Sequence, residues 1–159
     1  MNKETMFSSK RNDWATPWSL FKQIDEEFHF TLDVCADERN TKVPNNYFDE
    51  EKDGLRQVWS DETCWMNPPY GREITDWVKK AYLQSHNDNT RVICLLPART
   101  DTRWFHNYCW KSDSILFMKG RIKFDGHKNS APFPSCVVTF GCRISEDSSL
   151  QSLGKVVYL

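Results

Sequence analysis

The sequence predicts an α/β fold: a mostly parallel sheet with an antiparallel edge and helices on both faces. Segments with helical spacing alternate with short apolar runs over residues 17–110, and three strand-like runs then follow one another closely. The 159 residues suffice for one domain with a sizeable core. We therefore predict a single domain spanning residues 1–159.

The first third of the chain predicts a helix, a strand and an irregular stretch. Thr16 and Pro17 predict a helix start, a hydroxyl cap before proline at the first helical position, and helical spacing continues to residue 28. Residues 30–35 alternate and are β-rich, which indicates a strand with Asp33 near its carboxyl end. Residues 37–63 are irregular, with a short strand at 47–48 and a short helix or loop at 55–59.

The remaining elements begin with an apolar run that stops abruptly. Residues 64–66 predict a strand that ends at Asn67-Pro68-Pro69-Tyr70, because two consecutive prolines cannot continue a central strand. Apolar periodicity and turn residues then predict, in order, a helix at 73–85, a strand at 91–96, a helix at 101–110, and strands at 114–118, 121–124 and 135–140.

Composition excludes several classes of protein. The 21 Lys and Arg nearly balance the 22 Asp and Glu, so the chain is not a globally basic binder of polyanions. The longest apolar run, 92–96, is too short to cross a bilayer, and residues 1–11 are polar without a hydrophobic signal region. We expect a cytoplasmic protein with no membrane partner.

The six cysteines form no C-x-x-C pair, so we expect reduced, mostly buried thiols and no metal site. Their positions are 35, 64, 94, 109, 136 and 142. The tryptophans at 14, 18, 104 and 110 are expected in the core, since large rings are mostly buried.

The Asn67-Pro68-Pro69-Tyr70 turn has a chemical interpretation of its own. Ligands of α/β sheets collect at the carboxyl ends of strands, where Asp33 and this turn both fall. The Asn67 side-chain carbonyl and the Pro68 backbone carbonyl could accept both hydrogens of a conjugated amine and turn its lone pair outward. Tyr70 offers an aromatic face to a planar group. The alternative is a proline-rich turn whose Asn67 caps the following helix.

An ordered set of motifs spans most of the chain and resembles the phage-type DNA N6-adenine methyltransferase (Dam-like) family. The matching residues are Trp14-x-Thr16-Pro17, Leu32-Asp-Val-Cys-Ala36, Asp53-Gly-Leu55 followed by Trp59, Asn67-Pro-Pro-Tyr-Gly71 with Trp77, Leu96-Pro-Ala-Arg-Thr-Asp101 with Trp104-Phe105, Gly120-Arg-x-x-Phe124, and Ala131-Pro-Phe-Pro-Ser135. The resemblance implies the seven-stranded, Rossmann-like methyltransferase sheet, S-adenosylmethionine as cofactor, and methyl transfer to the N6 amine of a flipped adenine in DNA.

The same resemblance assigns site residues. Those implied in catalysis are Asn67, Pro68, Pro69 and Tyr70. Those implied in cofactor binding are Thr16 and Pro17 near the methionine end, Asp33 and Ala36 after the first strand, Asp53 and Leu55 around the adenine, and Asn67. The chain departs from many methyltransferases because no glycine follows the first strand, and only Ala36 is small there. The groups that hold the ribose and carboxylate stay open, with Asp37 and Asp49 as candidates for the ribose.

Contacts with double-stranded DNA are expected from a local basic segment. Residues 119–128 carry four basic residues against Asp125, a net charge of +3 without His127. The candidate contact residues are Arg99, Arg103, Lys119, Arg121, Lys123, His127 and Lys128. The alternative is a solvated hairpin. No separate target-recognition domain fits, so loops would read a short sequence, and a homodimer would extend the footprint.

Other readings of the same residues stay open. The chemistry also suits an RNA adenine or a protein glutamine amide, and the absent glycine loop leaves open a catalytically silent anti-restriction module that binds DNA or cofactor. The resemblance implies a phage- or prophage-encoded enzyme acting in a bacterial host cell.

Overall fold

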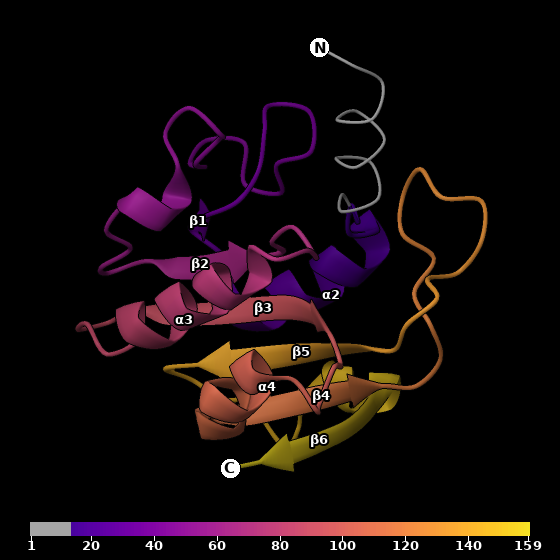
Figure 1. Cartoon of the computed structure of the whole chain (residues 1–159). Coiled ribbons are helices and arrows are strands. Elements are labelled where there is room, and N and C mark those ends of the chain that lie inside the picture. Colours follow the sequence, from indigo (N-terminus) through magenta and orange to yellow (C-terminus); the bar gives the residue numbers. More distant parts are fainter. Residues whose placement is uncertain (1–13) are drawn as a thin grey trace.

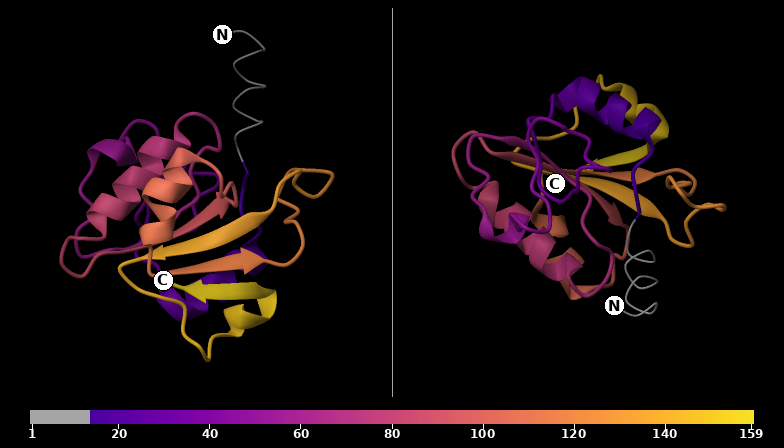
Figure 2. Two further views of the ribbon diagram at one scale, coloured as in Figure 1. Left: turned by 60° about the horizontal axis from the view of Figure 1, so that its bottom comes forward. Right: turned by 90° about the horizontal axis from the view of Figure 1, so that it is seen from above.

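The computed structural model describes residues 14–159, and these form one six-stranded sheet with helices on both faces (Figure 1). The predicted polar N-terminal segment, residues 1–11, lies outside the described residues. Viewed from above, α2 and the C-terminal η3 cover one face, and α3 and α4 cover the other (Figure 2). The predicted α/β architecture with helices on both faces is confirmed.

The strand order is β1-β2-β3-β5-β4-β6. The strands span β1 Leu32–Asp33, β2 Thr63–Met66, β3 Arg91–Pro97, β4 Ser114–Met118, β5 Ser135–Phe140 and β6 Gly154–Tyr158. β1, β2 and β3 pair in parallel, whereas β3 with β5, β5 with β4, and β4 with β6 pair antiparallel.

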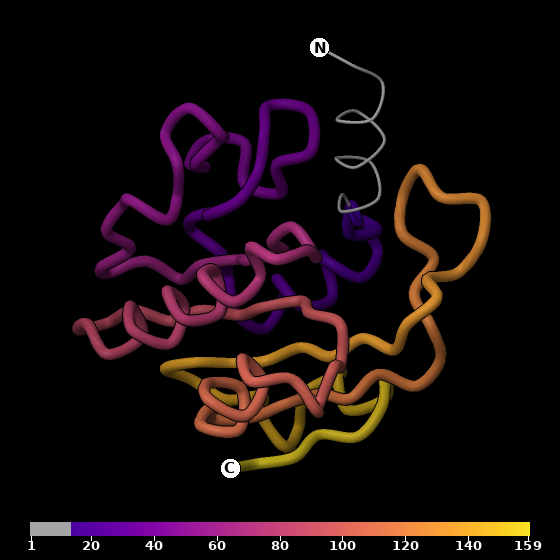
Figure 3. Tube along the Cα trace, viewed as in Figure 1, coloured from indigo at the N-terminus to yellow at the C-terminus, as the bar shows by residue number. Residues whose placement is uncertain are grey.

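The expectation of a mostly parallel sheet is therefore wrong for the described residues, because three of the five pairings are antiparallel. Four strands still run in one direction, since β4 points the same way as β1, β2 and β3. The six strands also differ in number from the implied seven-stranded sheet, and residues 34–62 form loops and one 3-10 turn rather than a further strand (Figure 3).

The helices lie close to their predicted positions. They are α2 Trp18–Phe28, α3 Ile74–Gln84 and α4 Arg103–Asn107, with 3-10 turns η1 Gly54–Arg56, η2 Cys109–Lys111 and η3 Ser149–Leu153. The helix predicted at 101–110 is divided between α4 and η2. Neither η3 nor β6 was predicted from the sequence.

Three predicted strands are corrected by the structure. The first strand is only Leu32–Asp33, and 47–48 contributes a single bridge between Tyr47 and Asp33. Residues 121–124 are not a strand, although Ile122 and Phe124 are buried in alternation. The bridge between Ala15 and Asp125, just after this segment, is isolated, so the segment has no neighbouring strand among the described residues with which to form a ladder.

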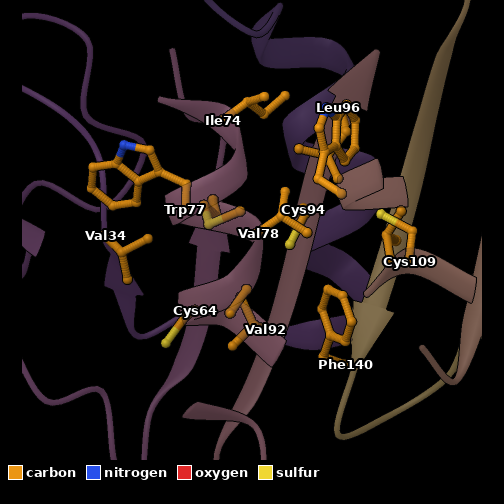
Figure 4. Close-up of a cluster of buried hydrophobic side chains, with 14 of the residues drawn as sticks. Val34, Cys64, Ile74, Trp77, Val78, Val92, Cys94, Leu96, Cys109 and Phe140 are labelled. Atoms are coloured by element: carbon orange, nitrogen blue, oxygen red, sulfur yellow. The ribbon is translucent and has the colours of Figure 1, made fainter. Parts of the chain in front are cut away.

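Two apolar clusters pack on the two faces of the sheet. One joins α3 and α4 to β2 and β3, and Figure 4 shows Trp77 and Val78 of α3 beside Cys64, Val92 and Cys94. The other joins α2 and η3 to the opposite face and includes Phe21, Trp65 and Leu150. Burying both faces is what a largely apolar central strand such as β3 requires.

Most of the cysteines are buried, as the sequence predicts. All six are free thiols; four are buried, and those at 35 and 142 are partly exposed. Burial raises the pKa of Cys94 and Cys136 well above the ordinary thiol value, which makes these thiols poor nucleophiles. The part of the chain that the structure describes contains no group of acidic, His and Cys side chains that could hold a metal, and no helix there is long and apolar enough to cross a membrane.

Candidate active site

The carboxyl ends of the parallel strands bring distant sequence motifs together. β1 ends at Asp33 beside Trp65, and Asn67 follows β2 directly. The N-terminal segment at 14–16 crosses this edge and is bonded to Asn67. The loop at 119–134 extends from the same side, beyond the end of β4 (Figure 1).

Hydrogen bonds fix the orientation of the Asn67 amide. Its Nδ2 donates to the backbone carbonyl of Trp14 and, at 3.0 Å, to the Thr16 hydroxyl. A carbonyl can only accept, so Nδ2 and not Oδ1 must face Trp14. Asn67 Oδ1 is buried and has no hydrogen-bond partner within the described residues. Buried polar atoms are rarely left unpaired, so this oxygen is available to accept a hydrogen bond from a ligand.

The structure overturns both capping interpretations of these motifs. The N-cap of α3 is Glu73, so Asn67 does not cap the helix that follows the turn. The N-cap of α2 is Pro17, without a side-chain cap bond, so the buried Thr16 hydroxyl does not cap that helix. Thr16 instead accepts from Asn67.

The rest of the turn is anchored to the central strand. The Tyr70 hydroxyl donates to the Leu95 carbonyl of β3 at 2.8 Å, and its burial raises the pKa of this phenol well above 10. The Tyr70 ring stands edge-on to Phe124 and Phe133, with centroids 6.3 and 5.6 Å away. Pro68 is buried and Pro69 partly buried, and neither has a backbone N–H.

Asp33 is buried at the end of β1, where it organises the next loop. Its carboxylate accepts from the backbone N–H of Lys42 at 2.9 Å and of Cys35 at 3.4 Å, and from the Thr41 hydroxyl at 3.5 Å. Burial raises the pKa of Asp33 to about 7, despite these donors and the nearby Lys42 charge, which lower it. The carboxyl group holds the segment from Cys35 to Lys42 against the sheet edge.

The Asp53-Gly54-Leu55 turn presses on the end of the same strand. A Cβ on Gly54 would lie 2.1 Å from the Val34 carbonyl oxygen, so no larger residue fits without a shift. Asp53 accepts from the Leu55 N–H at 3.2 Å and pairs with the exposed Arg56 at 3.5 Å. The structure thus brings this turn next to Val34, the residue that follows Asp33.

Asp37 and Asp49, the candidates for binding the ribose, accept hydrogen bonds from the backbone of their own turns. Asp37 accepts from the backbone N–H groups of Arg39 and Asn40, at 2.8 and 2.9 Å. Asp49 accepts from the N–H of Lys52 at 2.9 Å. Ala36, the small residue of the loop, is partly exposed, and its N–H donates to Phe48.

The basic residues of the 119–134 loop face solvent. Lys119, Arg121, Lys123 and Lys128 are exposed, whereas His127 is partly buried and stacks on Trp14 with ring centroids 4.2 Å apart. The loop is also anchored to the rest of the protein, because Phe124 and Phe133 pack edge-on against Trp14. Its apolar residues are docked while its cations stay accessible.

A cavity of about 350 Å³ lies beside the Asn67-Pro68-Pro69-Tyr70 turn, between the segment that follows β2 and the end of β3. Its lining includes Tyr70, Arg72, Arg99, Thr102 and Trp104. Arg99 is exposed and its guanidinium lies 6.0 Å from the Phe133 ring. Arg103 is exposed at the start of α4 and does not line this cavity.

Sequence reasoning missed two features of the site. Lys42 is buried, and its ammonium lies 4.2 Å from the ring of Trp18, which is 46% exposed and not a core residue as expected. Burial lowers the pKa of Lys42, and the charges of Asp125 and Asp33 raise it. The backbone carbonyl of Trp14 was also missed, because no side-chain pattern indicates where a carbonyl points. Only the position of Lys42 soon after Asp33 was available as a signal.

Known proteins with related sequences include phage DNA methyltransferases. The family described as DNA N-6-adenine-methyltransferase (Dam) matches residues 3–146. A DNA N-6-adenine-methyltransferase of Haemophilus phage HP1 (strain HP1c1) is 36% identical over 127 residues, which cover 78% of this chain and 72% of that protein. One of Escherichia phage T1 is 30% identical over 117 residues, 72% of this chain but only 48% of that protein.

Proposed function

The chain belongs to the DNA N-6-adenine-methyltransferase (Dam) family, and from this premise we propose that it moves a methyl group from S-adenosylmethionine to N6 of an adenine in double-stranded DNA. As a member of that family it is an adenine-specific DNA methyltransferase. The observation that carries the finer proposal is the buried, unpartnered Asn67 Oδ1 at the carboxyl end of β2.

The adenine amine needs an environment that makes its nitrogen nucleophilic. Its lone pair is delocalised into the ring, so two acceptors that take both hydrogens draw the nitrogen toward tetrahedral geometry. Asn67 Oδ1 is one acceptor, and the Pro68 backbone carbonyl is the second. Positive charge that develops on the amine is stabilised by these fixed dipoles, and the proton leaves to solvent after transfer.

The amide of Asn67 is suited to this task because its own hydrogens are already engaged. Both Nδ2 contacts are intramolecular, to the Trp14 carbonyl and the Thr16 hydroxyl. The amide therefore does not have to reorganise when the base arrives, and preorganisation of this kind accounts for much of the rate enhancement in many enzymes.

The loops after β1 fit S-adenosylmethionine, which when bound supplies an electrophilic methyl group on a sulfonium. Cys35, Phe48 and Leu55 are apolar, only partly buried and packed on the same core cluster, a surface suited to the flat face of an adenine. The Asp53 carboxylate, 41% exposed, lies in the same turn as Leu55. Pro17 and Ala36 complete the set that we propose for the cofactor, and Asp33 acts by holding the loop in place.

A flipped adenine would meet Tyr70, whose ring orientation is set by its bond to Leu95 and its edge-on contacts. Removing a base from the duplex costs a few kcal/mol, which stacking on an aromatic ring partly offsets. We propose that the cavity with Arg72 and Arg99 takes the DNA next to that base. Arg103 and the exposed cations of the 119–134 loop would contact phosphates, with His127 at the base of the loop.

The experiment offers the enzyme tritiated S-adenosylmethionine with duplex DNA, RNA or protein. Label in DNA, recovered as N6-methyladenine, is the expected result. Label in RNA adenine or in a protein glutamine would replace the proposed substrate, and no label in any of them would replace the proposed activity with a binding role. Methylation-aware sequencing of host DNA with and without the gene then gives the sequence context.

A further inference from the structure

Trp14 contacts both the Asn67 amide and the basic 119–134 loop. Its backbone carbonyl accepts from Asn67 Nδ2. Its side chain lies among three rings of the 119–134 loop, with centroids 5.4 Å from Phe124, 4.2 Å from His127 and 5.1 Å from Phe133. The same residue therefore contacts the two parts of the site that act on the base and on the DNA backbone.

A backbone pairing reinforces this connection. Ala15 and Asp125 form a β-bridge, in which the Asp125 N–H donates to the Ala15 carbonyl at 2.9 Å. The next residue, Thr16, is buried and supplies the second acceptor for Asn67. Residues 14–16 thus form one short strip with the loop on one side and the catalytic amide on the other.

The strip determines which atom Asn67 presents. Without the Trp14 carbonyl, the amide could rotate by half a turn, since the Thr16 hydroxyl can either accept from Nδ2 or donate to Oδ1. The rotated amide would offer hydrogens where the adenine amine also offers hydrogens. Only the orientation imposed by Trp14 leaves an acceptor for the substrate.

We propose that Trp14 and Thr16 are positioning residues that hold the Asn67 amide in its accepting orientation and connect it to the 119–134 loop. DNA that contacts the loop then stabilises the strip, and the strip stabilises the amide. The inference rests on the proposed role of Asn67 in adenine methylation, and its first test does not require methyl transfer.

The first test is NMR of the Asn67 side-chain amide in the 18.8 kDa protein. Its two proton signals are identified by their loss in Asn67→Ala. In the native protein both protons are expected to exchange slowly with water, and Thr16→Val is expected to speed exchange of one of them, whereas Thr16→Ser keeps it slow. Fast exchange of both protons in the native protein would overturn the proposal whether or not the enzyme methylates adenine.

The second test separates positioning from cofactor binding. Thr16→Val is expected to lower kcat about tenfold, with the Kd for S-adenosylmethionine unchanged and with rescue by Thr16→Ser. Thr139→Val is the control, because that hydroxyl is equally buried but bonds to Ser114 at the start of β4, away from the carboxyl end of β2 where Asn67 lies. A weaker cofactor Kd with an unchanged kcat would assign Thr16 to the cofactor and overturn its positioning role.

The third test addresses the connection with the loop. Trp14→Leu keeps the carbonyl but removes the ring, and we expect a lower kcat together with weaker DNA binding, partly restored in Trp14→Phe. Trp110→Leu is the matched control, since Trp110 is also half-buried among aromatics but packs against Phe105 and Phe117 on the other face. The control variant is expected to change thermal stability alone. If Trp14→Leu also changes only thermal stability, the proposed connection between the loop and the Asn67 amide is overturned.

Discussion

At the scale of single residues, the site depends on atoms that the protein leaves unpaired or unusually buried. Asn67 Oδ1 is an acceptor without a partner in the described chain, although a buried amide oxygen normally finds one. Asp33 is a carboxyl group with a pKa near 7, raised by burial. Both groups lie where parallel strands end. Both are buried because the backbones of loops and strands surround them closely.

Asn67→Ala is expected to lower methyl transfer by at least about a hundredfold, because it removes an acceptor aligned with the developing charge. Cofactor affinity, measured by calorimetry, should be close to native, since the loops after β1 are untouched. Asn107→Ala, a change at an exposed position on α4, serves as the control. Near-native turnover of the Asn67→Ala enzyme would refute the proposed mechanism.

At the scale of elements, short turns rather than long helices build the site. The Asp53-Gly54-Leu55 turn, the Asn67-Pro68-Pro69-Tyr70 turn and the 119–134 loop each contribute side chains, while α2 and α3 supply apolar faces that pack against the sheet. Sequence patterns located α2, α3, β3, β4 and β5 within one or two residues, since periodicity records which face of an element is buried.

Gly54→Ala is expected to reduce the free energy of unfolding by about 3 kcal/mol, because its Cβ would overlap the Val34 carbonyl oxygen. Urea denaturation measures the loss, and calorimetry should show weaker cofactor binding as the turn is displaced. Gly120→Ala is the comparison, since an added Cβ there meets nothing within 4 Å. Only the positive φ of 78° at Gly120 then lowers the free energy of unfolding of that variant. Equal losses in the two variants would show that close packing at Gly54 is not the cause.

Neutralising Lys123 and Lys128 to Gln is expected to weaken DNA binding and to lower the slope of log affinity against log salt by about 2, one counterion for each phosphate contact. Both side chains are exposed on the 119–134 loop. Lys111 is an exposed lysine that precedes β4, at the other end of that strand from the 119–134 loop. The Lys111→Gln substitution should therefore leave the slope unchanged. An unchanged slope in the loop variant would remove this loop from the DNA interface.

At the scale of the whole molecule, a net charge of −1 coexists with a basic loop on one side of the sheet. The homodimer and the single-domain boundaries stay predictions, and light scattering of the purified chain with and without DNA tests the first. Global stability depends on Asp33, because the native state holds its proton more tightly than the unfolded chain does.

The sign of that dependence follows from the raised pKa. Between about pH 4 and 7 the native protein keeps the Asp33 proton while the unfolded chain loses it, so this group makes stability fall with rising pH by up to ~1.4 kcal/mol per unit. Above pH 7 its contribution is constant. Urea melts across this range should show the decline in the native chain and its absence in Asp33→Asn. Parallel pH profiles would contradict the raised pKa.

The sequence by itself determined the α/β class, the positions of the main helices and strands, and the turn at residues 67–70, because burial periodicity and proline restrictions act over neighbouring residues. Only the tertiary structure decided that three of the five strand pairings are antiparallel, that residues 121–124 form no strand, and that Thr16 binds Asn67 rather than capping α2. These features depend on which backbone groups find partners far along the chain, and the carbonyl of Trp14, 53 residues from Asn67, is the clearest case.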